Sequence, residues 1–157
     1  APGGVLATLG TDYSHEVAFT GQDHIKEGTP VTDYNSNPPT SGPHWPDPQL
    51  DGVYDKVIPD EGMVHALEHG RIWISYKPSI SDSAKEVLRR IGNAGTLLVV
   101  TERPNNDTDI ALAAWQRLDT FNIGSGGIVD EKRIYDFIAR YRDKGPEKVP
   151  MMVGKRY

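Results

Sequence analysis

The sequence predicts an α+β fold in a single domain, and three observations lead to this prediction. The chain has 157 residues, which is about the length of one average domain. Residues 72–143 carry hydrophobic patterns in the order strand, helix, strand, strand, helix. A long proline-rich loop region, residues 31–62, precedes them. We therefore expect residues 1–62 to form a loop-rich part that covers the site, residues 63–145 an α/β core, and residues 146–157 a tail.

The first half of the predicted core is a strand followed by an amphipathic helix. Upstream of it, only Val17 to Phe19 reads as a short strand. Residues 72–77 are rich in β-branched and aromatic side chains and read as a strand. In the following segment, Ser81 to Ile91, apolar residues recur on one helical face, namely Ala84, Val87, Leu88 and Ile91. Ser79 or Ser81 is placed to cap this helix, and Gly92 and Gly95 are expected to end it.

The second half of the predicted core begins with a buried strand at residues 96–101. A strand, helix and strand of this size predict a right-handed crossover with parallel strands. The pattern of residues 110–121 fits a helix or a strand, and the short turn before them favours a strand antiparallel to the preceding one. Asp130 is placed to cap a last helix, which ends at Gly145-Pro146 and has a core face of Ile134, Phe137, Ile138 and Tyr141. This order matches the second half of a thioredoxin-like sheet, although the redox cysteines are missing.

The composition excludes several classes of function. The chain has no cysteine, so thiolate zinc sites, iron–sulfur clusters and cysteine-ligated copper centres are excluded. A formal charge of −5 argues against a nucleic-acid partner, which normally requires a basic face. No stretch approaches the roughly 18 consecutive apolar residues of a membrane span. A chain that begins at Ala1 without an initiator methionine suggests a removed leader or a truncation.

Two histidines with helical spacing are the strongest functional signal. His65 and His69 are four residues apart, so in a helical turn their side chains share one face, about 5–6 Å apart at Cβ. Gly70 is suited to end this turn because glycine adopts the left-handed conformation without strain. His44 ends the upstream segment Asn37-Pro38-Pro39-Thr40-Ser41-Gly42-Pro43-His44, whose prolines stiffen the backbone. Three imidazoles suit copper, zinc, nickel or iron, so we predict a metal site at His44, His65 and His69.

The same motifs carry a resemblance to a known family. The segments PPTSGPH (38–44) and VHALEHG (64–70), in this order and spacing, resemble a bacterial family catalogued as a domain of unknown function (number 3105). The likeness begins at His24, includes Tyr34 and Tyr54, and continues weakly from Trp115 to Gly145-Pro146-Glu147. Members of that family look like extracytoplasmic proteins with an amino-terminal signal or membrane anchor. The resemblance therefore implies a periplasmic, secreted or membrane-anchored protein, with any anchor outside this chain, and it implies no established activity.

Ligand chemistry favours copper over zinc at the predicted site. Thioether sulfur is a good ligand for Cu(I) and a poor one for zinc, and Met63, Met151 and Met152 are all placed where one could become a fourth ligand. Methionine is more often a flexible core residue than a ligand, so this argument is open. His24 is a further ligand candidate. Glu68 is expected to orient an imidazole from outside the ligand set.

The sequence leaves three functional hypotheses. A histidine site without an obvious general base favours copper capture, storage or delivery, with a metal-donor or metal-acceptor protein as partner. His65-Ala66-Leu67-Glu68-His69 also matches H-x-x-E-H, a zinc-peptidase motif in which the glutamate activates water, and Glu147 is a coincidental candidate for its downstream ligand. That motif needs a long helix, whereas Gly70 predicts that the turn ends at once. The third hypothesis is a metal-free interaction module in which the histidines hydrogen-bond the long loop to the core.

Overall fold

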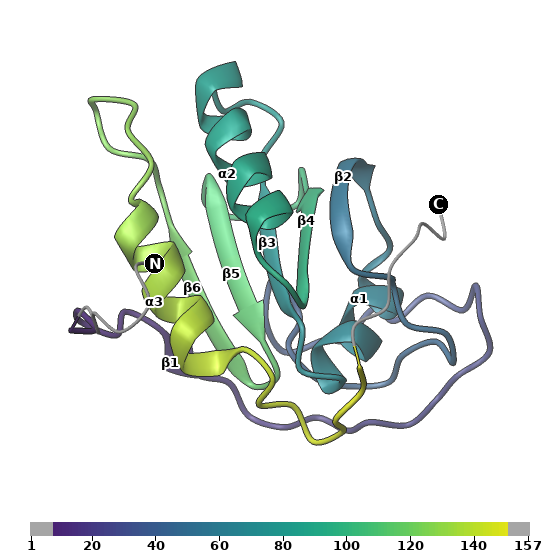
Figure 1. The fold of residues 1–157 in the computed structure, drawn as a ribbon. Coiled ribbons are helices and arrows are strands. Elements are labelled where there is room, and N and C mark those ends of the chain that lie inside the picture. The colour runs from purple at the N-terminus through teal and green to yellow at the C-terminus, as the bar shows by residue number, and fades with distance from the viewer. Residues whose placement is uncertain (1–7, 151–157) are drawn as a thin grey trace.

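A six-stranded mixed sheet organises residues 8–150, the part of the chain that the computed structural model describes (Figure 1). Across the sheet the strands are ordered β1-β6-β5-β3-β4-β2. The strand β4 is parallel to both of its neighbours, and the pairs β3–β5, β5–β6 and β6–β1 are antiparallel. This architecture confirms the predicted α+β class. The elements are β1 (His15–Glu16), β2 (Gly52–Val57), α1 (Asp60–Glu68), β3 (Ile72–Tyr76), α2 (Asp82–Ala94), β4 (Leu98–Glu102), β5 (Ile110–Ala114), β6 (Arg117–Phe121) and α3 (Glu131–Tyr141).

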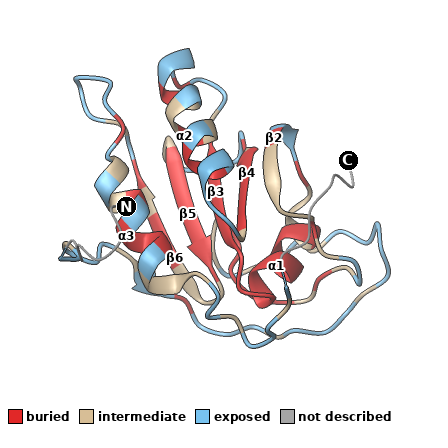
Figure 2. Cartoon of the chain, viewed as in Figure 1, coloured by how far each residue is buried: buried red, intermediate tan, exposed pale blue. Residues whose placement is uncertain are grey.

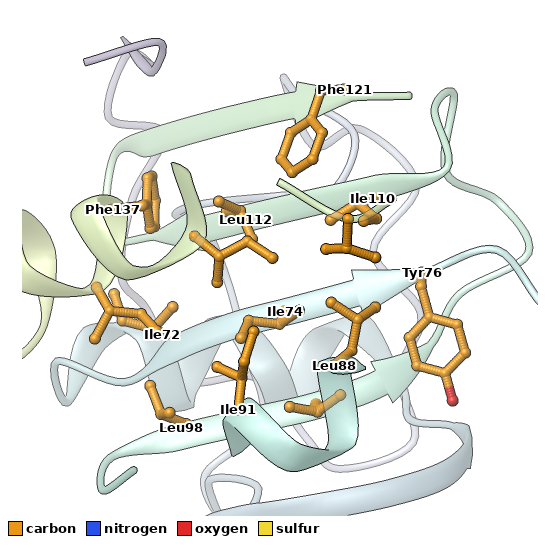
Figure 3. Packing of buried hydrophobic residues seen from close by; sticks show 14 of the residues in the cluster. Ile72, Ile74, Tyr76, Leu88, Ile91, Leu98, Ile110, Leu112, Phe121 and Phe137 are labelled. Atoms are coloured by element: carbon orange, nitrogen blue, oxygen red, sulfur yellow. The ribbon is translucent and has the colours of Figure 1, made fainter. Parts of the chain in front are cut away.

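The sheet is covered on both faces, because successive side chains of a strand point to opposite sides. Ile72, Ile74 and Tyr76 of β3 join the larger hydrophobic cluster, which includes the apolar faces of α2 and α3 (Figure 3). Trp73, between them, belongs to a second cluster with residues of α1 and the amino-terminal part. Figure 2 shows that α1 and the central strands are almost wholly buried. The helix that carries His65, with His69 as its cap residue, therefore packs against the sheet.

The predicted strand–helix–strand unit is present, with β3 and β4 parallel. Ser81 caps α2 as predicted, since its hydroxyl accepts a hydrogen bond from the amide of Ala84 at 3.1 Å. Gly92 does not end the helix, which continues to Ala94. A Cβ at residue 92 would lie 2.5 Å from Cγ2 of Val100 and 2.7 Å from Cγ2 of Val53. Gly92 therefore lets α2 approach the sheet, and that requirement is why a glycine lies inside a helix.

The stretch from residue 110 to residue 121 is two strands, where the sequence predicted one. β5 and β6 form a hairpin in which Ala114 pairs with Arg117, so the turn consists of Trp115 and Gln116. Gln116 has a φ of 59°, a conformation that usually selects glycine or asparagine, and the absence of such a residue hid the turn. β5 runs antiparallel to the parallel pair as expected, but its hydrogen-bonded neighbour is β3 and not β4.

Two more corrections concern the first 62 residues. The proline-rich region contains the strand β2, and α1 begins inside it at Asp60. β2 is an edge strand with exposed side chains at its carboxyl end, so it has little of the alternation that marks a strand. The strand expected at Val17 to Phe19 is absent, and the two-residue β1 lies just before it. Between residues 8 and 150 no helix is long and apolar enough to cross a membrane.

The segment after α3 folds back onto the end of α1. The helix α3 ends at Tyr141, before the predicted Gly145-Pro146. The amide of Asp143 then donates to the carbonyl of Gly70 at 2.8 Å, and the amide of Glu147 donates to the carbonyl of Glu68 at 3.1 Å. A Cβ at Gly145 would lie 2.3 Å from the Glu68 carbonyl oxygen. Glycine at position 145 thus permits a backbone contact that brings Glu147 to the predicted metal site.

Candidate metal site

The last turn of α1 presents three polar side chains that the fold buries. His65 and Glu68 lie on the helix, and His69 is its carboxyl-terminal cap residue, with an amide that donates back to the carbonyls of His65 and Ala66. Gly70 has a φ of 86°, which confirms the predicted left-handed glycine. The exposed fractions are 4% for His65, 1% for Glu68 and 7% for His69. Polar groups so deeply buried require partners, which makes their environment informative.

The proline-rich loop brings a third histidine to this turn. The amide of Trp45 donates to the carbonyl of Glu61 at 3.2 Å, which fixes the loop along α1. His44, just before it, is completely buried. Its ring centroid lies 4.7 Å from that of His65, so the two imidazoles are direct neighbours. The loop therefore closes over the turn as predicted.

The amino-terminal segment contributes a fourth histidine, His24, to the cluster. His24 and His44 form an isolated parallel bridge, in which the amide of Ile25 donates to the His44 carbonyl at 2.9 Å and the amide of His44 donates to the Asp23 carbonyl at 3.0 Å. The ring centroid of His24 lies 5.1 Å from that of His44 and 4.9 Å from that of His65. His24 is exposed, unlike the other three, so it forms the solvent side of the cluster.

Backbone carbonyls fix the tautomers of two of these rings. Nδ1 of His44 lies 2.8 Å from the carbonyl oxygen of Gly42, and Nδ1 of His65 lies 2.6 Å from that of Trp45. A carbonyl only accepts, so each Nδ1 carries the hydrogen and each Nε2 of the neutral ring keeps its lone pair. Burial lowers the pKa of His44, and it lowers the pKa of His65 to about 4, so both rings are neutral at pH 7. Metal-bound histidines show this same orientation by a hydrogen bond to the other nitrogen.

The lone pair of His44 faces an oxygen that cannot donate to it when ionised. Nε2 of His44 lies 3.3 Å from Oε1 of Glu68, and neither atom has a hydrogen-bond partner among the described residues. Because His44 is neutral, this contact is not an ion pair: with Glu68 ionised it is an approach of two acceptors, whereas a protonated Glu68 can donate to the lone pair of His44. Burial, together with the charge of Glu147, raises the pKa of Glu68 to about 7. A cation between the two atoms would satisfy both.

His69 extends the cluster toward the segment after α3. Its Nε2 lies 3.1 Å from Nε2 of His65 and 3.7 Å from Oε1 of Glu147. Burial lowers the pKa of His69, and its Nδ1 has no hydrogen-bond partner in the described part of the chain. Half of the Glu147 side chain is exposed, so the cluster reaches solvent on this side too.

The potential ligand atoms divide into two adjoining groups. In the first, one atom from each of His24, His44, His65 and Glu68 lies within 4.8 Å of all the others, and in the second the same holds for Glu68, His69 and Glu147. The predicted trio is thus brought to one place, with His44 and His65 in one group and His69 in the next. Three imidazoles and a carboxylate are suitable ligands for zinc, copper or iron.

Comparison with known proteins gives one finding. A family described as "Protein of unknown function (DUF3105)" matches residues 24–152. The chain belongs to the DUF3105 family. No curated protein and no solved structure matches the chain. The range matched by the DUF3105 family begins at His24 and includes the other histidines and both glutamates of the cluster.

The sequence did not predict Glu68 as a ligand, and it offered Glu147 as one only within the rival H-x-x-E-H hypothesis. Glu68 was expected only to orient an imidazole, yet its Oε1 reaches into the first group. Glu147 appeared only as a coincidental candidate, and the one signal that pointed to it was its place in the DUF3105 resemblance after Gly145-Pro146. Met63 is fully buried in the hydrophobic cluster around α1, which is the packing role that competed with a ligand role. Met151 and Met152 lie outside the described residues.

Proposed function

We propose that this protein binds a divalent transition-metal ion through His24, His44, His65 and Glu68, and that it serves in metal capture, storage or delivery. The single observation that supports the site most strongly is the contact between Nε2 of His44 and Oε1 of Glu68, two buried atoms without hydrogen-bond partners among the described residues, which are both acceptors once Glu68 is ionised. The carbonyls of Gly42 and Trp45 already orient His44 and His65 as ligands. Such preorganisation lowers the entropic cost of binding an ion.

Copper remains the proposed metal, and of the two oxidation states that the sequence leaves open we propose Cu(II). Among divalent ions of the first transition row, Cu(II) binds a given set of nitrogen and oxygen ligands most tightly, and zinc is the alternative. The methionine argument for Cu(I) is weaker, because Met63 packs in the core. The carboxylate of Glu68 also favours a harder ion than Cu(I).

The burial of the site favours metal capture, storage or delivery over catalysis. His44 and Glu68 are at most 1% exposed, and among the described residues of this cluster only His24 and Glu147 are exposed. The rival H-x-x-E-H hydrolase gains one supporting feature, since Glu147 lies beside His69. However, α1 has nine residues and ends at Glu68, so His69 is not within the long helix of that motif. Peptide hydrolysis by the zinc-loaded protein would support the hydrolase hypothesis instead.

The proposed role includes an extracytoplasmic location and exchange of the ion with a donor or acceptor protein. The resemblance of the histidine motifs to extracytoplasmic proteins supports the location. The exposure of His24 supports exchange, because an incoming partner can reach that ligand first. Fractionation of cells that express the natural gene tests the location directly, and recovery in the cytoplasm would contradict it.

The test of the site is metal titration of untagged protein and two variants. His65→Ala removes an oriented ligand and is expected to weaken Cu(II) and Zn(II) binding by at least about 100-fold. This factor corresponds to one quarter of the binding free energy of a four-ligand site. His15→Ala is the matched control, because His15 is exposed on β1 and outside both groups. Circular dichroism checks that both variants fold. Equal binding by the wild type and His65→Ala would refute the proposed site.

A further inference from the structure

The second group of ligand atoms is separate from the first except for Glu68. It consists of Glu68, His69 and Glu147, each with a ligand atom within 4.8 Å of the other two. This group combines one imidazole with two carboxylates, whereas the first has three imidazoles and shares the carboxylate of Glu68. The side chain of His69 is 9% exposed, and its Nδ1 is unpartnered among the described residues. An imidazole buried beside two carboxylates is a recognisable ligand set for a divalent ion.

The backbone holds this second group in place. The segment after α3 is attached to the end of α1 by the hydrogen bonds of Asp143 with Gly70 and of Glu147 with Glu68. Arg71 secures both sides, since its guanidinium donates to the carbonyl of His69 at 3.0 Å and to that of Val149 at 2.8 Å. Glu147 therefore comes to His69 on a fixed segment and not on a free tail. Rigid support of this kind is what a metal ligand requires.

We infer that Glu68, His69 and Glu147 bind a second divalent ion, so that each chain holds two ions with the Glu68 carboxylate between them. This inference rests on the proposed function of the first site. A carboxylate has two oxygens and can bind one ion with each, as in sites where paired ions lie about 3.5–4 Å apart. Oε1 of Glu68 faces His44 in the first group, which leaves the other oxygen for the second.

The two positions differ in affinity because their charges differ. The first ion has three imidazole ligands and the charge of the Glu68 carboxylate. The second ion must share Glu68 with an ion already bound, and it also lies near Arg71, whose charge acts on His69. The Glu147 side chain is half exposed, so water already stabilises its charge. It therefore gains less free energy from binding an ion than a buried carboxylate does. Titration is therefore expected to show a tight step and then a weaker one.

The experiment is native mass spectrometry and calorimetric titration with Zn(II), repeated with Cu(II). The wild type is expected to bind two ions. Glu147→Gln keeps the side chain's size and removes its charge, and it is expected to bind one ion with the affinity of the tight step. Glu86→Gln is the matched control, because Glu86 is an exposed glutamate on α2 whose side chain is 75% exposed. It is expected to bind two ions.

Electron paramagnetic resonance of the Cu(II)-loaded protein adds an independent readout. Two Cu(II) ions joined by one carboxylate interact magnetically, which lowers the signal intensity per copper ion. The wild type is therefore expected to give a weaker signal per copper ion than Glu147→Gln, which binds a single ion. One ion in the wild type, or two ions in Glu147→Gln at unchanged affinity, would overturn the second position and leave the first intact. No ion in the wild type would overturn the proposed function itself.

Discussion

Gly145→Ala is expected to lower the free energy of unfolding, because the added methyl group has no space. A Cβ at this position would lie 2.3 Å from the carbonyl oxygen of Glu68 and 2.6 Å from the amide nitrogen of Gly70. Both atoms belong to the backbone at the end of α1, so neither can move aside as a flexible side chain can. The segment after α3 must therefore separate from α1.

The size of the effect follows from the contacts that this separation breaks. The hydrogen bonds from Asp143 to Gly70 and from Glu147 to Glu68, at 2.8 and 3.1 Å, would both be lost. Each contributes about 0.5–1.5 kcal/mol, so the expected loss is about 1–3 kcal/mol, which is also the usual cost of an overpacked methyl group. For a domain of this length, the melting temperature falls by about 2–4 °C for each kcal/mol.

Urea unfolding followed by tryptophan fluorescence measures this loss. Gly124→Ala is the matched control, since a Cβ there meets no atom within 4 Å, and its stability is expected to stay within about 0.5 kcal/mol of the wild type. Gly145→Ala also displaces Glu147, so it is expected to weaken the second metal step while leaving the first. If Gly145→Ala and Gly124→Ala unfold at the same urea concentration, the close approach at residue 145 is wrong.

Three further predictions concern burial, capping and pH. Arg71→Met removes a fully buried guanidinium that pairs with the partly buried Asp51, with the closest atoms 2.7 Å apart, and is expected to cost about 3–5 kcal/mol in urea unfolding. Ser81→Ala removes the cap of α2 and is expected to cost about 1 kcal/mol, whereas Ser79→Ala should leave stability unchanged; equal effects would refute the cap. In metal-free protein, the pKa of Glu68 is raised from its usual 4.5 to about 7, so between these pH values the native state keeps a proton that the unfolded chain has released. The stability that Glu68 contributes is therefore complete below pH 4.5 and lost as the pH rises through 7; a stability difference between the wild type and Glu68→Gln that does not change from pH 4.5 to pH 8 would contradict the raised pKa.

The part of the site that depends on short spacing along the chain could be predicted from the sequence. The interval between His65 and His69 and the glycine that follows predict a turn that ends at residue 70, and the left-handed Gly70 confirms it. The nearness of His44 was predicted from its place at the end of the stiff proline segment and from the DUF3105 resemblance, and its ring centroid does lie 4.7 Å from that of His65. The constraint on His65 and His69 acts within a few residues, whereas the strand β2 lies between His44 and α1.

The other part depends on contacts between distant segments, which leave little local signal. His24 reaches the cluster because its strand-like segment pairs with the backbone of His44, and only its place at the start of the DUF3105 resemblance distinguishes it from the exposed His15 in the sequence. Glu147 reaches it because glycine at residue 145 permits contact with α1. The turn at Gln116 was missed for a related reason, since tertiary packing imposes a backbone conformation that the residue itself does not favour.

The same atoms that suit a metal ion are a cost to the metal-free fold. A buried acceptor without a partner costs about 1–3 kcal/mol, and Nε2 of His44 and Oε1 of Glu68 are two such atoms in contact once Glu68 is ionised, which in the metal-free protein happens as the pH rises through about 7. Native structures keep few such atoms, and those that persist often belong to functional sites. An ion present at 100 times its dissociation constant would stabilise the native state by about 2.7 kcal/mol, which is comparable to that cost. Replacing Glu68 with an apolar residue would relieve the cost without an ion, so its presence in a sheltered cluster of imidazoles is better explained by binding than by folding.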